Sequence, residues 1–213
     1  MYRPAHFAED RVEVLQALIR EHPFATLVSR AGDSLVADHL PLQLSADGTR
    51  LLGHVARANP LWKTAVGQNV LVVFQGPQAY VSPSWYPTKH EHGKAVPTWN
   101  YVVVHARGRL TAIDDPNGLR SLLDDLVDRH EGEFAQPWRV SDAPPDYIEK
   151  MLSAIVGIEI GITSLAGKWK ISQNQPATNR AGVVAGLGER GTDQADDMAA
   201  LVAATLRDSS ANS

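Results

Sequence analysis

The sequence predicts a mainly β (α+β) protein, an antiparallel barrel with helices at its ends. Short runs of β-branched and aromatic residues follow one another with turn residues between them, which is typical of consecutive antiparallel strands. Helical periodicity is confined to the N-terminal segment, to the connection 116–155 and to the C-terminal region. The strands therefore do not alternate with helices, as they would in a parallel doubly wound sheet.

The first part of the chain predicts a helix followed by a hairpin. In residues 9–21 apolar side chains recur at helical spacing, and the pattern ends at a His-Pro pair because the residue before a proline is disfavoured in a helix. Residues 24–30 and 34–44 are apolar runs joined by Ala-Gly-Asp, a typical hairpin turn. Pro41 in the second run predicts an edge position or a bulge, since proline donates no ladder hydrogen bond. Residues 50–56 add a short strand.

The rest of the chain contains two long strands and several helices. Residues 69–81 form an apolar strand interrupted by Gly-Pro, and residues 101–113 form the clearest strand of the sequence. A loop rich in Pro, aromatic residues and His separates these two strands. The other expected elements are one or two helical turns at 58–66, helices at 115–131 and 147–154, a last strand at 156–165, and a helical tail that ends in a frayed SSANS.

Composition excludes several classes of protein. The 213 residues suit one domain of ordinary size, with or without a short appendage. The sequence has no run of about 18 apolar residues to span a membrane, and no cysteine for disulfides, thiolate metal sites or nucleophilic catalysis. A formal net charge of -4 argues against a protein that binds nucleic acid chiefly by electrostatics. We expect a cytoplasmic protein, because no segment addresses the chain elsewhere.

No high-information catalytic motif is present, such as G-x-S-x-G, a P-loop, H-E-x-x-H or a G-x-G-x-x-G that opens a helix. The feature most like a metal site is His90-x-His92, in a loop without a flanking element to fix it. A solvated loop is the better interpretation, so we predict no metal. His105 lies on a regular strand with no Ser or Cys motif beside it, and we interpret it as a structural histidine.

Residues 53–63 run from the end of a strand to the start of a helix. Free backbone N–H groups at a helix start, together with Arg57 and Lys63, would form a phosphate pocket. The alternative is that Asn59 only caps the helix and that Arg57 is solvated. Both interpretations stay open on the sequence alone.

The segment 82–101 concentrates aromatic residues. Trp85, Tyr86, Trp99 and Tyr101 stand there among Ser, Thr and Asn. Aromatic rings with hydroxyl and amide partners suit stacking on a planar ligand, and they suit a dimer interface equally well.

A basic segment follows the last strand. In residues 167–175 (GKWKISQNQ), an extended backbone would place Lys168 and Lys170 on one side and Trp169 and Ile171 on the other. The segment is then a rim strand with a basic outer face, a lid over an anionic ligand, or an edge whose lysines deter pairing with another sheet.

Six longer sequence words occur in order between Met1 and about Gly188. They are MYRPAHF at 1–7, HLPL at 39–42, GHVARANPLW at 53–62, FQGPQAYVSPSWY at 74–86, VPTWNYVVVHARG at 96–108 and GKWKISQNQ at 167–175. This ordered set resembles the PaiB-like family of FMN-binding negative transcriptional regulators, a branch of the FMN-binding split-barrel proteins.

The resemblance implies a six- to seven-stranded antiparallel split β-barrel with peripheral helices. It also implies a homodimer with FMN at the subunit interface. We accordingly expect a split-barrel domain at 1–175 with a helical insertion at 116–155, and a helical C-terminal extension at 176–213.

A looser similarity to pyridoxamine-phosphate-oxidase-like split barrels places the cofactor. It implies that residues 38–42 line the isoalloxazine ring and that residues 54–63 hold the phosphate, with Arg57 and Lys63 in contact with it. The chain has Ala-Arg-Ala-Asn-Pro where the oxidase group commonly has Ser-Arg-Lys, and Gln175 where the last family word commonly ends in Arg. The candidate cofactor residues are Asp38, His39, Leu40, Pro41, His54, Val55, Arg57, Asn59, Lys63, Trp99 and Asn100.

The function implied by the resemblance is that of a negative transcriptional regulator that binds FMN. A flavin-dependent oxidoreductase is the alternative, and a heme-binding or heme-degrading split barrel with His39, His54 or His105 as iron ligand is a weaker one. If promoter DNA is a partner, we expect a basic patch that includes Lys168, Lys170, Arg180 and Arg190. The sequence does not settle whether the protein is an enzyme.

Overall fold

The computed structural model describes residues 1–210 and contains two compact units. Unit 1 consists of Met1–Leu15, Gln75–Val104 and Ala166–Ser213, and unit 2 consists of Gln16–Phe74 and His105–Leu165. The expected extension 176–213 begins inside unit 1, and its residues 211–213 lie outside the described residues. The expected domain boundary after residue 175 stays a prediction.

The described residues form one eight-stranded sheet with the strand order β3-β2-β6-β7-β8-β5-β4, and β1 pairs with β8. The strands are β1 (Ala8–Glu9), β2 (Phe24–Ala31), β3 (Ser34–Pro41), β4 (Gln43–Leu44), β5 (Arg50–Ala56), β6 (Asn69–Val81), β7 (Thr98–Ile113) and β8 (Ile155–Lys170). The pairs β1–β8, β2–β3, β2–β6, β4–β5 and β5–β8 are antiparallel, as predicted. The number of strands exceeds the expected six to seven because β1 and β4 are two-residue strands.

The chain itself draws the two ends of the sheet together. In the strand order β3 and β4 are the outermost strands, yet only Leu42 separates them in sequence. The backbone N–H of Leu42 donates to the carbonyl oxygen of Pro23 at 2.8 Å, and a Cβ on Gly53 of β5 would lie 2.8 Å from the Pro41 oxygen. The sheet therefore curls into a barrel. The barrel is open between β3 and β4, because no ladder joins these two strands within residues 1–210. The predicted split barrel is therefore confirmed.

Alternation along the strands builds the core of the barrel. In unit 2, every second side chain of β2, β5 and β6 points inward, and Leu27, Leu51, Val72 and Phe74 are fully buried. In unit 1, the first half of β7 contributes the buried side chains of Val102 and Val104. Burial of these large apolar side chains is the main force that stabilises the fold.

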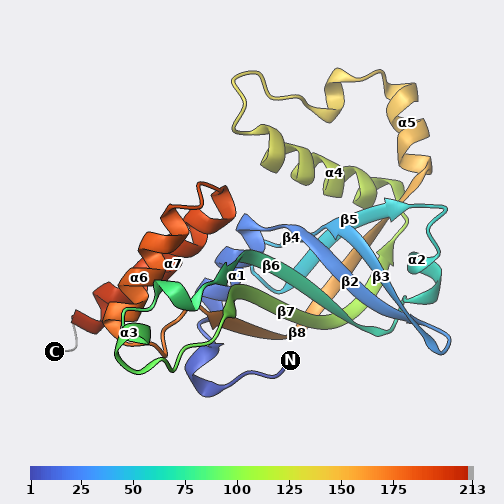
Figure 1. Ribbon diagram of the computed structural model, residues 1–213. Coiled ribbons are helices and arrows are strands. Elements are labelled where there is room, and N and C mark those ends of the chain that lie inside the picture. The colour runs from blue at the N-terminus through green and yellow to red at the C-terminus, as the bar shows by residue number, and fades with distance from the viewer. Residues whose placement is uncertain (211–213) are drawn as a thin grey trace. The chain divides into compact units, whose positions relative to one another are not determined.

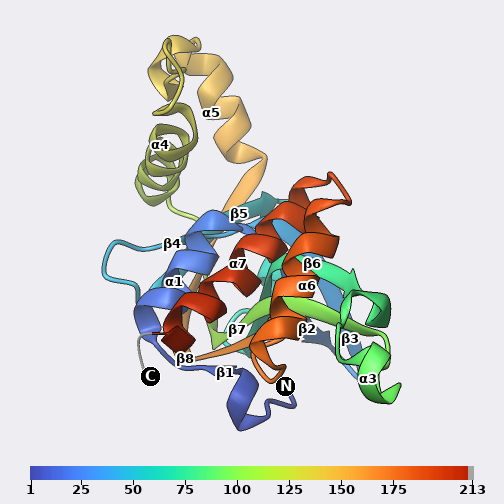
Figure 2. The same ribbon diagram turned by 60° about the vertical axis from the view of Figure 1, so that its left-hand side comes forward.

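Seven α-helices occur in the described residues. They are α1 (Val12–Glu21), α2 (Leu61–Thr64), α3 (Lys89–His92), α4 (Pro116–Glu131), α5 (Pro145–Ser153), α6 (Ala177–Gly188) and α7 (Asp193–Ser210). The predicted helices of the long connection are confirmed as α4 and α5, drawn in yellow tones in Figure 1. In Figure 2, α6 and α7 lie side by side. None of the helices described is long and apolar enough to cross a membrane.

Two strands are longer than the sequence indicates. β6 runs unbroken through Gly76 and Pro77, and just after them the N–H of Gln78 donates to Oε1 of Gln194 on α7 at 3.3 Å. β8 continues to Lys170 because β1 pairs with the last residues of this strand, with Ala8 opposite Lys168.

Trp85 packs against α6 in the same chain. A Cβ added at Gly186 would lie 2.5 Å from Cγ of the Trp85 indole and closer still to Cδ2 and Cε2. The ring therefore lies directly on the helix backbone at this glycine. The neighbouring Tyr86 is buried, which raises the pKa of its hydroxyl. The contact with α6 accounts for the position of Trp85, and a dimer interface at these two aromatic residues stays a prediction.

Candidate functional site

The segment between β5 and α2 is fixed by Asn59. The side-chain oxygen of Asn59 accepts a hydrogen bond from the N–H of Leu61 at 2.9 Å, and its Nδ2 donates to Oδ1 of Asp38 at 2.8 Å. The hydrogen bond expected of a capping Asn is therefore present, although the cap residue of α2 is Pro60. The same side chain links the end of β3 to the start of α2, so two segments predicted to hold the cofactor lie together.

Arg57 is held by other parts of unit 2. Its Nε donates to the carbonyl oxygen of Ser153 at 2.7 Å, and its Nη2 donates to Oδ1 of Asp114 at 2.6 Å and to the carbonyl oxygen of Ile155 at 2.9 Å. The hydrogen bond to Asp114 raises the pKa of Arg57 and lowers that of Asp114. The guanidinium of Arg57 is thus partly exposed but already bonded to three acceptors, and it ties the end of β7 to the start of β8.

Lys63 is the available cation of this segment. Its Nζ lies 4.9 Å from the centre of the Trp62 ring, at cation–π distance, and it has no ion-pair partner among residues 1–210. The Trp62 indole is fixed in turn, since its Nε1 donates to the carbonyl oxygen of Arg57 at 2.9 Å. An aromatic face and an exposed ammonium group therefore stand together at the helix start.

The other candidates of unit 2 differ in exposure. His54 on β5 is partly buried, and burial lowers the pKa of its imidazole. His39 and Pro41 on β3 are exposed. Leu40 and Val55 lie in the core, with 5% and 7% of their surfaces exposed, so any ligand contact by them would come from backbone atoms.

Trp99 and Asn100 belong to unit 1, whereas the other candidates belong to unit 2. Trp99 is half-exposed and meets Tyr80 edge-to-face, with 6.1 Å between the ring centres. Asn100 is 1% exposed, and its Nδ2 donates to Oγ of Ser172 at 2.9 Å. Asn100 therefore belongs to a buried polar pair.

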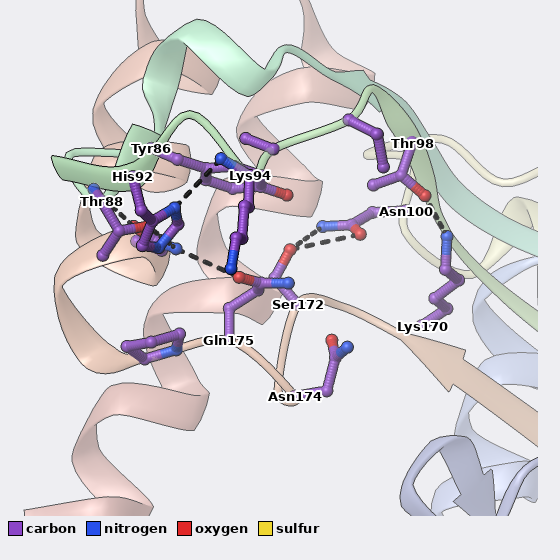
Figure 3. A pocket seen from close by; sticks show the side chains of 14 residues that line it. Tyr86, Thr88, His92, Lys94, Thr98, Asn100, Lys170, Ser172, Asn174 and Gln175 are labelled. Atoms are coloured by element: carbon purple, nitrogen blue, oxygen red, sulfur yellow. Dashed lines mark hydrogen bonds between the residues drawn. The ribbon is translucent and has the colours of Figure 1, made fainter. Parts of the chain in front are cut away.

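That pair forms part of a polar cavity in unit 1 with a volume of about 380 Å³ (Figure 3). The lining comes from the connection between β6 and β7, the start of β7, and the residues from the end of β8 to the start of α6. Ser172 has a left-handed backbone, with φ of 63°, which is rare for a residue with a side chain. Sequence reasoning singled out Asn100 and Lys170 here but missed the cavity.

A second cavity lies in unit 2, with a volume of about 650 Å³. Its walls combine apolar side chains with two arginines. It is lined by Val28, Ser29, Arg30, Leu35, Asn69, Val70, Leu71, Arg107 and Thr163. Sequence reasoning gave Arg30 no role, and the signal was weak, because a single Arg at the end of a hairpin strand is ordinary. Nearby in sequence, burial lowers the pKa of His105.

The expected basic patch is wrong for two of its members. Lys168 and Arg180 are 8% and 7% exposed, so neither lies on the surface. Lys168 Nζ donates to the carbonyl oxygen of Tyr2 at 3.2 Å, and Arg180 Nη1 donates to that of Thr205 at 2.6 Å. The physical reason is that Lys168 lies against the N-terminal segment and the rings of Tyr2 and Tyr101, while Arg180 on α6 reaches α7.

No group of three or more His, Asp or Glu side chains that would hold a metal ion occurs in the part of the chain that the structure describes. His90 and His92 lie exposed on α3.

The family model FMN_bind_2, "Putative FMN-binding domain", matches residues 1–164. The chain belongs to this family. The match covers both segments joined by the Asp38–Asn59 hydrogen bond, and it confirms the resemblance found in the sequence.

Two relatives of this family member match over nearly their whole length. An uncharacterized protein of Emericella nidulans is 34% identical, and the match covers 95% of this chain and 96% of the relative. The Bacillus subtilis protein named protease synthase and sporulation protein PAI 2 is 32% identical, with 97% and 99% covered.

Solved structures share the fold of this family member. The flavocytochrome Anf3 from Azotobacter vinelandii superposes with a TM-score of 0.58 at 17% identity, over 79% of this chain and 72% of that chain. The FAD and heme binding protein from Mycobacterium smegmatis gives 0.57 at 19%, over 76% and 71%. At these identities the likeness concerns the fold alone.

Proposed function

We propose that the chain binds FMN where β3 and β5 meet α2. The observation that carries the proposal is the hydrogen bond of 2.8 Å between Asn59 and Asp38. It joins the two segments that the resemblance assigns to the ring and to the phosphate. Membership of the FMN-binding family supports the same ligand.

The residues present fit the parts of this cofactor. Lys63 would hold the phosphate, because it is the cation of the segment without an acidic partner in the described chain. The carboxylate of Asp38 would accept hydrogen bonds from ribityl hydroxyls, and the Trp62 ring offers an aromatic face. A bound flavin supplies electron transfer, while the protein supplies binding and orientation.

Arg57 takes a different role in this proposal. Three acceptors within the chain already occupy its guanidinium, so a phosphate would have to compete with them. We assign Arg57 to positioning: it holds the backbone from which Trp62 and Lys63 project. The predicted direct contact between Arg57 and the phosphate remains a prediction.

Titration of the flavin-free protein with FMN and with riboflavin tests the site, because the two ligands differ only in the phosphate. We expect Lys63→Gln to weaken FMN binding about tenfold, the scale of one charge-assisted hydrogen bond, and to leave riboflavin binding unchanged. Lys150→Gln is the matched control, since Lys150 is an exposed lysine of the same unit on α5. Quenching of flavin fluorescence gives both affinities.

Two results would overturn the proposal. One is a parent protein that binds neither flavin. The other is a Lys63→Gln variant that binds FMN as tightly as the parent, which would place the phosphate elsewhere, for example at Arg30 and Arg107 of the second cavity.

We further propose that the protein acts as a homodimeric negative regulator of transcription. The resemblance and the similarity to the Bacillus subtilis relative support this role. β3 is an edge strand with exposed apolar side chains, Leu35 at 75% and Val36 at 41%, which supports pairing with a second copy. A footprint on promoter DNA with and without bound FMN tests the role, and no footprint in either state would refute it.

A further inference from the structure

We propose that the polar cavity of unit 1 binds a small oxyanion, either a carboxylate or a phosphate. The inference goes beyond the proposed flavin site, whose residues belong to unit 2. The volume of about 380 Å³ is in the usual range for small-molecule sites. The cavity is lined by Tyr86, Thr88, His92, Lys94, Ala95, Val96, Thr98, Asn100, Lys170, Ser172, Asn174, Gln175, Pro176 and Asn179.

The charge of the lining favours an anion. Lys94 and Lys170 line the cavity, and none of its lining residues is Asp or Glu. The ammonium group of Lys170 donates to the carbonyl oxygen of Trp99 at 2.7 Å and to Oγ1 of Thr98, which fixes its position. Burial lowers the pKa of Lys170, an indication that its surroundings include no compensating acid.

The lining also offers several hydrogen-bond donors. Nδ1 of His92 accepts the backbone N–H of Lys94 at 3.0 Å, so the proton of the neutral ring lies on Nε2. Oε1 of Gln175 accepts from Nδ2 of Asn179 at 3.1 Å, which leaves the NH₂ group of Gln175. Within the described residues, no hydrogen bond occupies this NH₂ group, the Asn174 side chain or Nζ of Lys94. Figure 3 shows these side chains around the cavity.

The floor of the cavity is rigid before any ligand arrives. Asn100 and Ser172 exchange hydrogen bonds of 2.9 and 3.3 Å, and both are nearly fully buried. Asn179, 3% exposed, is fixed in the same way by Thr88, whose Oγ1 accepts from its Nδ2 at 2.9 Å. A floor that is already ordered does not add the entropic cost of fixing these side chains when a ligand binds.

The first turn of α6 adds to the positive potential. Gln175, Pro176 and Asn179 place the start of this 12-residue helix at the cavity. The cap residue of α6 is Pro176, whose side chain has no hydrogen-bond acceptor. No side chain at the cap position therefore bonds to the first backbone N–H groups of the helix. These groups and the helix dipole favour a negative ligand.

Titration of the ¹⁵N-labelled protein with inorganic phosphate and with acetate, in separate arms, tests the site. We expect saturable shifts of the Asn100 and Ser172 amide signals with at least one of the two anions. Phosphate alone would identify a phosphate ester as the ligand class, and acetate alone would identify a carboxylic acid.

Two variants locate the binding. Lys94→Gln removes a charge from the lining, and Gln175→Glu keeps the acceptor used by Asn179 while it replaces the NH₂ donor with a negative oxygen. Each should weaken anion binding about tenfold. Lys89→Gln is the matched control with the same loss of charge in the same connection, because Lys89 bonds to Ser84 and does not line the cavity. Its affinity should stay within about twofold of the parent.

Three outcomes would overturn the inference. The first is the absence of saturable shifts with both anions, and the second is equal affinity in Lys94→Gln and the parent. The third is a parallel loss of FMN affinity in Lys94→Gln with riboflavin binding unchanged, since the cavity would then hold the phosphate of the cofactor. Binding of phosphate or acetate is measured without flavin, so a failure of the flavin proposal does not affect the result.

Discussion

Replacement of Gly186 by Ala should destabilise the protein, although alanine is the better helix former. Gly186 lies within α6, where Ala is favoured over Gly by about 1 kcal/mol. The added methyl would lie 2.5 Å from Cγ of Trp85 and closer to two further ring atoms, far inside van der Waals contact. The indole or the helix must therefore move by about 1 Å, because carbon atoms pack at about 3.5–4 Å.

The net effect follows from these two opposing contributions. Overpacking of a well-packed site costs about 1–3 kcal/mol, and a displacement of a rigid bicyclic ring belongs at the upper end. After the gain in helix propensity, we expect a loss of about 2 kcal/mol in the free energy of unfolding. For a chain of this length, that corresponds to a decrease in Tm of about 4–8 °C.

Urea unfolding followed by circular dichroism measures the change, and the same helix offers a control. A Cβ at Gly188 would meet nothing within 4 Å, so Gly188→Ala should be neutral or slightly stabilising. In the background of Trp85→Ala, the cost of Gly186→Ala should disappear. Equal stability of the Gly186 and Gly188 variants would refute the packing of Trp85 on α6.

Three further predictions concern unit 2. Acid should destabilise the protein through His54, because burial lowers the pKa of this imidazole below the ordinary 6.5. Below pH 6.5 the unfolded state therefore binds more protons than the folded state, and the free energy of unfolding falls as the pH drops. The urea midpoint of His54→Gln should therefore fall less than that of the parent between about pH 7.5 and about pH 5.5, and an equal fall would contradict the prediction. Arg57→Ala should let the pKa of Asp114 rise toward its ordinary 3.8, as followed by NMR of the carboxyl carbon, whereas an unchanged pKa would show that the hydrogen bond does not form in solution. Leu35→Glu should convert the proposed homodimer to a monomer in light scattering, and a monomeric parent would be evidence against the dimer.

Local patterns in the sequence predicted most of the fold. Alternating apolar residues and turn residues predicted the β2–β3 hairpin, and helical spacing predicted α4 and α5, because each signal depends on neighbours in sequence. The end of β8 was missed, since the residues up to Lys170 combine glycine with lysine and are held extended by pairing with β1, about 160 positions away. Lys168 was therefore taken for a surface residue.

The candidate site, too, was only partly predictable from the sequence. Asn59 was predicted as a cap from its position before a proline, and the structure has its hydrogen bond to the N–H of Leu61, with Pro60 as the cap residue of α2. Its second bond, to Asp38, was not predicted, because the two residues are far apart in sequence and the resemblance only assigned both segments to the cofactor. The partner of Arg57 lies 57 positions away at Asp114, so the sequence left open whether this guanidinium was solvated or bound an anion. The anion cavity of unit 1 went unnoticed because two stretches far apart in sequence, within residues 86–100 and 170–179, contribute its lining.

Unit 1 is assembled from three separate stretches of the chain, and the last of them begins at Ala166. The family match ends two residues earlier, at 164, so a gene trimmed to that boundary would encode β6 and β7 complete but would truncate β8 and delete α6 and α7. During synthesis, β1 in the N-terminal stretch can pair with β8 only after residues 167–168 have left the ribosome. Expression trials and truncation studies should therefore keep the C-terminal helices, although the family model ends before them.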